Sequence, residues 1–190
     1  MSSLLVAKVG GSLFDLSDLR DRIRVWQSRL AGSPVLLVPG GGRAADAVRC
    51  LDLAHQLGEA NAHWLALRAL AVNAHFLSAL LGIEVISTPV QLNGPIAVLD
   101  AHAFSQMDEA KIGALEHSWR VTSDSVAARV AAVVGGHLVL LKSTDLPVGM
   151  SWNEASRAGL VDEAFSSVVT DNRVRVLWIN LRAAEFAPRR

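Results

Sequence analysis

Short apolar runs alternate with stretches of helical periodicity along this chain, and this alternation restricts its fold more than any other feature. Six runs have the composition of buried strands, namely 4–7, 35–38, 84–86, 96–99, 137–141 and 174–179. Buried strands that are connected through helices form a mostly parallel sheet with helices on both faces. We therefore expect an α/β protein, a three-layer α/β/α sandwich with a mostly parallel central sheet.

One helical stretch differs from the others because it is apolar on most of its faces. Residues 60–81 contain Trp64, Phe76 and many leucines and alanines. A helix of this kind is either central in the fold or part of a subunit interface. We expect a homodimer that forms through this helix.

Size and charge restrict the broad class. The chain of 190 residues is most simply one domain, residues 1–190. Its formal net charge is zero, from 18 basic and 18 acidic side chains without a basic cluster, which argues against a nucleic-acid partner. No uninterrupted apolar run reaches the roughly 18 residues of a membrane span, and Met1-Ser2-Ser3 lacks the basic start of a signal peptide. We therefore expect no membrane partner.

The chain contains a single cysteine, Cys50. One cysteine excludes an intrachain disulfide and a cysteine metal cluster, which fits a reducing cytoplasm. Because Cys50 lies within a helical pattern, we expect it to be a small core residue. His55, His102, His117 and His137 lack the spacing of metal ligands, so we expect no dedicated metal site.

The segment from Lys8 to Ser12 has the layout of an anion site. It follows the first apolar run and places Lys8 before Gly10, Gly11 and Ser12, which lead into a helical pattern. Glycines allow backbone N–H groups to approach an oxyanion, and the following helix offers its positive end. The segment is not a Walker A loop, because its lysine precedes the glycines. A tight turn beside a surface lysine is the ordinary alternative.

Three further clusters follow strands or begin a helix. They are Gly40, Gly41 and Gly42 after the second run, Thr122, Ser123 and Asp124 at a helix start, and Lys142, Ser143, Thr144 and Asp145 after 137–141. In a parallel sheet the carboxyl ends of the strands meet at one edge, where ligands bind. Two glycine loops, two lysines and an aspartate at this edge would supply the donors and charges that phosphoryl transfer needs.

These motifs, in this order, resemble those of the amino acid kinase family, which includes aspartate, acetylglutamate, uridylate and isopentenyl phosphate kinases. The matching segments are Lys8-Val9-Gly10-Gly11-Ser12, Pro39-Gly40-Gly41-Gly42, Thr122-Ser123-Asp124-Ser125-Val126-Ala127 and Leu140-Leu141-Lys142-Ser143-Thr144-Asp145. The resemblance spans residues 4–145 and implies the amino acid kinase fold. The short length and the run from His117 to Asp124 are most similar to the small branch that contains the aminomethylfuran phosphate kinase of methanofuran biosynthesis.

The resemblance implies a role for each motif. Lys8 would stabilise the transferring phosphoryl group, Asp124 would orient the lysines, and Lys142 would contact the ATP phosphates. The other residues divide into a nucleotide-binding set, Gly10, Gly11, Ser12, Ser143, Thr144 and Asp145, and an acceptor-binding set, Gly40, Gly41, Gly42, Arg43, His63, Thr122 and Ser123. The implied activity is that of an ATP-dependent small-molecule kinase, with Mg²⁺ carried by the nucleotide. An acceptor that is already a phosphate or a carboxylate needs no general base.

Three basic side chains favour a phosphomonoester acceptor over an amino-acid carboxylate. Arg43 follows the triple glycine, and His63 and Arg68 lie on the apolar helix that flanks the implied acceptor pocket. His63 also matches a histidine of the small branch. The ordinary alternatives are a core or interface histidine and solvated arginines. Trp119 is expected to pack in the fold rather than to stack on a ligand.

The chain departs from larger family members in its C-terminal part. Those members carry a second lysine in a Gly-Gly-Met-like loop, whereas no lysine follows Pro147-Val148-Gly149-Met150 up to Arg190. We expect an acceptor lobe at about 1–120 and a shortened nucleotide lobe at about 121–190, where Lys142 takes over the missing function. The shortening leaves open a catalytically silent member of the fold that binds a ligand or supports assembly.

A dinucleotide-binding domain is another alternative. Gly40-x-Gly42-x-x-Ala45 after a strand satisfies the G-x-G-x-x-A pattern. The acidic partner of that pattern should end the next strand about 20 residues later, whereas Glu59 lies between two expected helices. This alternative also leaves Lys8 and Lys142 without a role.

Overall fold

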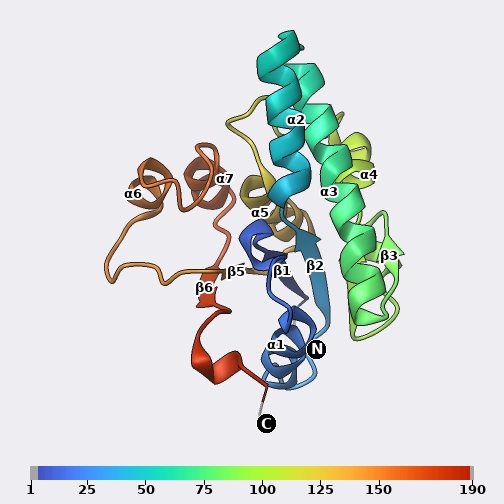
Figure 1. Cartoon of the computed structure of the whole chain (residues 1–190), viewed down its shortest axis with the longest axis vertical. Helices are drawn as coiled ribbons and strands as arrows, with labels where there is room; N and C mark the ends of the chain where they lie inside the picture. Colours follow the sequence, from blue (N-terminus) through green and yellow to red (C-terminus); the bar gives the residue numbers. More distant parts are fainter. Residues whose placement is uncertain (1–3, 189–190) are drawn as a thin grey trace.

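The computed structural model describes residues 4–188 and contains one six-stranded sheet (Figure 1). Its strands are β1 Leu5–Val9, β2 Val35–Pro39, β3 Val85–Ile86, β4 Ile96–Leu99, β5 His137–Lys142 and β6 Val176–Asn180. Their order across the sheet is β3-β4-β2-β1-β5-β6, and each neighbouring pair is parallel. The expected mostly parallel sheet is confirmed.

Helices cover the sheet on both faces, as the alternation of runs predicts. They are α1 Leu19–Ser28, α2 Gly42–His55, α3 Glu59–Leu81, α4 Ala101–Asp108, α5 Ser123–Val134, α6 Trp152–Arg157 and α7 Phe165–Asp171, with short 3-10 turns η1 Gly11–Leu13, η2 Pro89–Gln91 and η3 Ala184–Phe186. The three-layer α/β/α architecture is therefore confirmed.

The register of the central strands brings the predicted motifs to one edge of the sheet. On β1, Val9 is level with Pro39 of β2 and with Leu141 of β5. The residues that follow these three positions are the two glycine loops and Lys142. The first loop therefore lies between the segments that follow β2 and β5.

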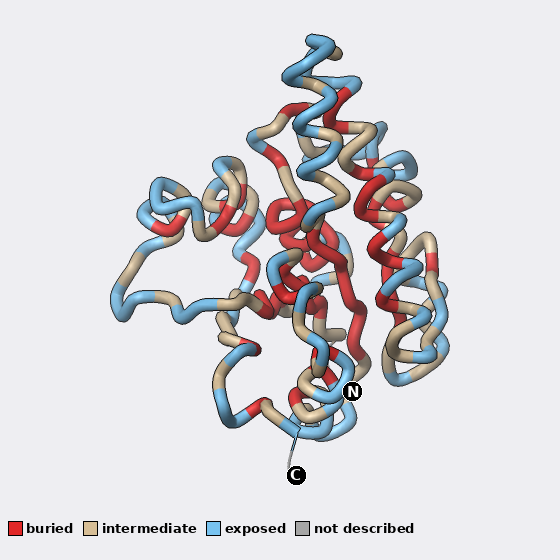
Figure 2. Tube along the Cα trace, in the orientation of Figure 1, coloured by how far each residue is buried: buried red, intermediate tan, exposed pale blue. Residues whose placement is uncertain are grey.

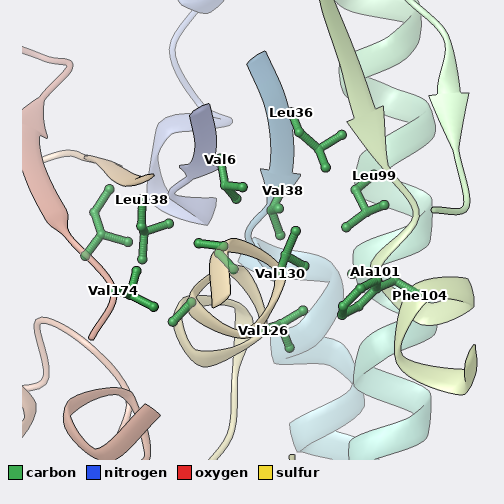
Figure 3. Packing of buried hydrophobic residues seen from close by; sticks show 14 of the residues in the cluster. Val6, Leu36, Val38, Leu99, Ala101, Phe104, Val126, Val130, Leu138 and Val174 are labelled. Carbon is green, nitrogen blue, oxygen red and sulfur yellow. The ribbon is translucent and has the colours of Figure 1, made fainter. Parts of the chain in front are cut away.

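Alternate residues of the strands pack into two separate cores because successive side chains point to opposite faces. On one face, Val6, Val38 and Leu138 pack with Val126 and Val130 of α5 (Figure 3). On the other face, strand residues pack with α1, whose buried residues are Leu19, Ile23 and Trp26. Figure 2 shows the buried positions gathered in the strands and in α5. Burial of β1, β2 and β5 on both faces explains their continuous apolar sequences.

Helix α3 contributes to both cores and extends beyond the sheet. Its Leu67 and Leu70 belong to the α5 side, whereas Ala74 and Leu77 belong to the α1 side. In Figure 1 the N-terminal part of α3 projects past the sheet with α2 beside it. By length and composition α3 would suffice to cross a membrane, since its most apolar window has a mean hydropathy of 1.4, with 33% of the window buried. Core helices of soluble proteins meet the same criterion.

The expectation of a buried Cys50 is wrong. Cys50 lies on α2 and is exposed, and α2 contains no buried residue. The helical pattern of residues 43–57 was correct, but α2 packs on α3 along one side only. Amphipathic spacing gives a helix, whereas the depth of burial depends on the partners that the helix meets.

The two glycine loops interlock, which explains two of the glycines. A Cβ atom on Gly11 would lie 2.3 Å from the backbone nitrogen of Gly42, and one on Gly40 would lie 2.4 Å from the nitrogen of Gly11. Both contacts are with backbone, so a side chain cannot be accommodated by rotation. The close approach of the two chain segments therefore requires glycine at both positions.

We predict that Gly11→Ala lowers the melting temperature by about 2–12 °C, because overpacking typically costs about 1–3 kcal/mol and each kcal/mol shifts a domain of this size by about 2–4 °C. Gly94→Ala is the matched control, since a Cβ on Gly94 meets no atom within 4 Å. Thermal unfolding followed by circular dichroism measures both. Equal melting temperatures for the two variants would contradict the interlocked arrangement.

Candidate active site

Lys8 and Lys142 meet on a single buried carboxylate at the carboxyl edge of the sheet. The Oδ1 atom of Asp124 lies 2.8 Å from Lys8 Nζ and 2.9 Å from Lys142 Nζ. The exposed fractions of the Lys8, Asp124 and Lys142 side chains are only 6%, 7% and 12%. Residues from β1, α5 and β5 thus converge as the motif positions predict.

The charges of this cluster depend on one another. Burial opposes ionisation of Asp124, but the two lysines more than compensate and hold its pKa below the ordinary value. Burial and the neighbouring Lys8 charge lower the pKa of Lys142 to about 8, although Asp124 acts against this change. Lys142 is therefore mostly a cation at pH 7 and loses its charge in mildly alkaline solution.

The turn between α6 and α7 holds both Lys142 and the start of α5. Lys142 Nζ donates a hydrogen bond to the carbonyl oxygen of Leu160 at 2.7 Å. Two residues later, Asp162 Oδ2 accepts from the backbone N–H groups of Thr122 and Ser125, both at 3.0 Å, and from the Thr122 hydroxyl at 2.8 Å. The Ser125 hydroxyl donates to the other Asp162 oxygen. Asp162 thereby caps α5 on both sides of Asp124.

Asp162 is a site residue that sequence reasoning missed. It lies in the stretch 147–170, which has no pattern beyond loop and short helix. Burial and the nearby Asp124 charge raise the pKa of Asp162, against the hydrogen bonds from Ser125 and Thr122. Its function arises only from a contact between segments about 40 residues apart, so no local sequence signal could have revealed it.

The first glycine loop also contacts the segment after β5. The Ser12 hydroxyl donates to the Ser143 hydroxyl at 2.9 Å, and the Gly10 N–H donates to the Leu141 carbonyl at 2.8 Å. Thr144 and Asp145 lie exposed beyond β5. Two lysines, two hydroxyls and glycine N–H groups at one place form a donor set that fits phosphate oxygens.

A cavity of about 230 Å³ opens beside the lysine cluster. Five residues of the expected acceptor-binding set line it together with Lys8 and Asp124, namely Gly41, Gly42, His63, Thr122 and Ser123. Its apolar wall comes from Leu67, Leu70 and Val121. The cavity therefore joins the reacting centre to a pocket of the size of a small molecule.

Gly40 is not among the residues that line this cavity. Its carbonyl oxygen, like that of Gly41, accepts a hydrogen bond from the Asn73 amide at 2.7 Å. Asn73 is buried on α3 and fixes the second glycine loop to that helix. Sequence reasoning missed Asn73 because a single polar residue in an apolar helix does not show which loop it meets.

The two candidate arginines lie outside this cavity. Arg43 lines a neighbouring hollow together with Phe14, Asn73 and Phe76, and Arg68 is exposed on α3. The cavity instead contains Arg49, which lies 4.6 Å from the centre of the Trp119 ring. Arg49 and the lining position of Trp119 were not foreseen.

Trp119 packs as expected but also forms part of the cavity wall. Its Nε1 donates to Asp52 at 2.7 Å, which fixes the ring against α2. Because the ring lines the cavity, the packing function and contact with a ligand are compatible.

His63 is buried and held by a backbone group. Its Nδ1 lies 3.1 Å from the carbonyl oxygen of Ser118, and its ring stacks on His117 with centroids 5.5 Å apart. Burial lowers the pKa of His63, with the neighbouring His117 acting in the same direction and the Ser118 bond and Glu116 opposing. His63 is consequently neutral at pH 7 and does not supply the positive charge that the sequence suggested.

The fold and the match to a family of kinases define the class of this protein, an ATP-dependent phosphotransferase. The chain belongs to the amino acid kinase family, because the model of that family matches residues 3–146. The expected family and fold are confirmed.

Among proteins of assigned function, the chain is similar to the [5-(aminomethyl)furan-3-yl]methyl phosphate kinase of Methanocaldococcus jannaschii. The two are 24% identical over 199 aligned positions, which cover 95% of this chain and 89% of that protein. The similarity therefore extends beyond the family match into the C-terminal part.

Solved structures of nucleotide and amino-acid kinases share the fold. Uridylate kinase from Archaeoglobus fulgidus has a TM-score of 0.64 at 14% identity, with 93% of this chain and 90% of that one covered. Aspartate kinase from Synechocystis has a TM-score of 0.67 at 13% identity, with 96% of this chain and 39% of that one covered. These similarities indicate the same architecture. The dinucleotide-binding alternative does not hold, and its acidic candidate Glu59 is an exposed residue at the start of α3.

We predict that Asp162→Ala destabilises the start of α5 and lowers the free energy of unfolding by about 1–3 kcal/mol, the usual cost of leaving buried donors unsatisfied. Glu163→Ala is the matched control, because the Glu163 side chain is 71% exposed. Chemical denaturation of both variants measures the difference. A free energy unchanged in Asp162→Ala would show that Asp162 does not cap the helix.

Proposed function

We propose that the chain transfers the γ-phosphoryl group of ATP to a small-molecule phosphomonoester. The observation that supports this proposal most strongly is the pair of buried lysines on Asp124, beside both glycine loops. Phosphoryl transfer depends mainly on positioning and on stabilisation of spread negative charge. Fixed cations and backbone N–H groups in a buried site are the means by which a protein provides both.

Each residue of the centre has a distinct task in this proposal. Lys8, from the first strand, stabilises the negative charge of the phosphoryl group during its transfer. Lys142 pairs with the nucleotide phosphates, and Asp124 fixes both ammonium groups without accepting a proton. The acceptor oxygen of a phosphomonoester is already ionised, so the reaction needs no general base.

The acceptor would occupy the cavity beside the lysines. Its anionic group would lie near Lys8 and near the N–H groups of Gly41 and Gly42, where α2 begins. A phosphate acceptor is favoured by the similarity to a kinase whose named acceptor is a furanylmethyl phosphate. Arg43, His63 and Arg68 do not support this choice, because none of them supplies a cation to the cavity. An amino-acid carboxylate is the alternative acceptor.

The nucleotide would lie on the side of Ser12, Lys142 and Ser143, and it would carry Mg²⁺ with it. Within residues 4–188, no group of three or more His, Cys, Asp or Glu side chains is arranged to hold a metal ion. Asp124 and Asp162 are already occupied by lysines and by the start of α5. The triphosphate oxygens and water would therefore supply most of the ligands of Mg²⁺.

We also propose a homodimer formed through α3, in the cytoplasm and without a nucleic-acid partner. Val72 and Phe76 of α3 are large apolar residues that are 63% and 40% exposed. Leu51 and Leu53 on the adjacent α2 are exposed as well. Exposed large apolar side chains on two neighbouring helices favour association with a second protein surface.

We predict that Lys8→Ala reduces the rate of ADP formation by at least about a hundredfold, since a preorganised donor at developing charge typically contributes that much. The assay couples ADP release to a spectroscopic signal, with Mg²⁺-ATP and [5-(aminomethyl)furan-3-yl]methyl phosphate as substrates. Lys111→Ala is the matched control, because Lys111 is 54% exposed and pairs with Asp108 instead of Asp124.

Two outcomes would count against the proposal. Undiminished ADP formation by Lys8→Ala would show that Lys8 does not contribute to phosphoryl transfer. No ADP formation by the unmodified protein with phosphate or carboxylate acceptors would favour the silent binding protein.

A further inference from the structure

We propose that Arg182, in the segment that follows β6, binds the phosphates of the nucleotide and adds a cation to the phosphoryl-transfer site. The inference rests on the proposed function and assigns a further phosphate-binding residue to the same site. It follows from the way in which the C-terminal segment lies on the first glycine loop. This segment is outside residues 3–146, which match the family model.

The carboxyl edge of the sheet, where the two lysines meet, also includes the end of β6. Asn180, the last residue of β6, is level with Lys142 of β5. The N–H of Leu181 donates to the Lys142 carbonyl oxygen at 2.8 Å, which continues the pairing of the two segments. The side-chain oxygen of Asn180 accepts from the backbone N–H of Arg182 at 3.0 Å. Arg182 therefore leaves the sheet next to Lys142.

The guanidinium group of Arg182 lies on the first glycine loop. Its Nη2 atom donates to the Ser12 carbonyl oxygen at 2.8 Å and pairs with Asp15 Oδ1 at 2.6 Å. The Ser12 hydroxyl bonds to Ser143, and Ser12 also lines the cavity that contains Lys8. Ser12 thus connects Arg182 with the side of the reacting centre that we assign to the nucleotide.

Arg182 retains donors that the fold does not use. A guanidinium group has five N–H donors. The two bonds of Nη2 leave Nε and Nη1 without a hydrogen-bond partner among residues 4–188. The side chain is 39% exposed, so a ligand can reach these donors. Their planar arrangement fits phosphate oxygens, which arginine commonly binds through two parallel hydrogen bonds.

Lys142, in contrast, uses most of its donors within the protein. Its ammonium group donates to Asp124 at 2.9 Å and to the Leu160 carbonyl oxygen at 2.7 Å, which takes at least two of its three hydrogens. Asp124 also balances one of the two lysine charges. Because Lys142 is the last lysine of the chain, additional positive charge on this side has to come from arginine. Arg182 is placed to supply it.

Helix α1 holds the backbone on both sides of Arg182. The Nη1 atom of Arg22 donates to the carbonyl oxygens of Leu181 and Ala183 at 3.0 and 3.1 Å. Leu181 is fully buried in the core on the α1 side. The position of Arg182 is therefore fixed before a nucleotide arrives, and a fixed donor loses less conformational freedom on binding.

The affinity for phosphates tests this inference without requiring turnover. Mg²⁺-ATP and Mg²⁺-tripolyphosphate are titrated calorimetrically into the unmodified protein, Arg182→Gln and Arg182→Lys. Arg182→Gln should weaken the binding of both ligands by about tenfold, the usual effect of losing a hydrogen bond to a charged group. Similar losses for the two ligands would place the contact on the phosphates and not on the base or the ribose. Arg182→Lys should fall between, because it keeps the charge but not the fork.

Two control variants separate phosphate binding from support of the loop. Asp15→Asn removes the ion pair but still accepts a hydrogen bond from Arg182, so the cation remains and the affinity should stay the same or rise. If Arg182 acted only by holding the loop through this ion pair, Asp15→Asn and Arg182→Gln would weaken binding alike. Arg175→Gln makes the same change at an exposed residue just before β6, at the opposite end of the strand, and should have no effect.

A second measurement uses the unmodified protein. Phenylglyoxal modifies accessible arginine side chains, and mass spectrometry of peptides measures the extent of modification at each position. Bound Mg²⁺-tripolyphosphate should slow the modification of Arg182 severalfold and leave that of Arg175 unchanged. This result would not depend on whether a variant folds.

Several results would overturn the inference. They are an undiminished affinity in Arg182→Gln, a loss confined to ATP, equal losses in Asp15→Asn and Arg182→Gln, no protection of Arg182 from phenylglyoxal, and no binding of either ligand to the unmodified protein. If Arg182→Gln weakens binding as expected but no ADP forms with any acceptor, the phosphate contact stands and the kinase proposal fails. If ADP forms but the affinity does not depend on Arg182, the kinase proposal stands and this inference fails.

Discussion

The structure of the site depends on one carboxylate that neutralises two buried lysines incompletely. Asp124 balances one of the two positive charges of Lys8 and Lys142, so the cluster retains an excess cation in a place with little solvent. Burial of an unbalanced charge is costly, and an incoming phosphate relieves that cost. Removing one partner of such a pair typically costs about 3–5 kcal/mol. The positions of β1, α5 and β5 relative to one another are therefore important for stability. Asp162 contributes by fixing the start of α5.

Local patterns were sufficient for the fold and for most of the reacting centre. The apolar runs gave the strands because burial on both faces permits only apolar residues. Parallel register then brought Lys8 and Lys142 to one edge, where the start of α5 places Asp124 between them. The contributions of Asp162 and Asn73 could not be predicted, because each acts on a segment distant in sequence. The prediction that Cys50 is buried was wrong for a related reason. Burial of a helix depends on the segments that pack against it, and α2 contains no buried residue.

The character of the acceptor pocket shows a second limit of sequence reasoning. His63, Arg43 and Arg68 suggested a positively charged pocket. The charge of a histidine, however, depends on its surroundings in the fold, which the sequence does not show. Burial and the Ser118 carbonyl make His63 a neutral acceptor, while Arg43 and Arg68 lie outside the cavity. The cationic side chains that line the cavity are Lys8 and Arg49 instead.

The most direct measurement is the affinity for Mg²⁺-ATP between pH 6.5 and 9.5 (a range of about three units around the Lys142 transition) in the unmodified protein and in Lys142→Arg. Because the pKa of Lys142 is about 8, its cation is lost as the pH rises through that value. The affinity of the unmodified protein should therefore fall above about pH 8, whereas an arginine keeps its charge and should give a flat profile. Identical profiles in both proteins, or no binding of Mg²⁺-ATP, would contradict a phosphate site built on Asp124 and its two lysines.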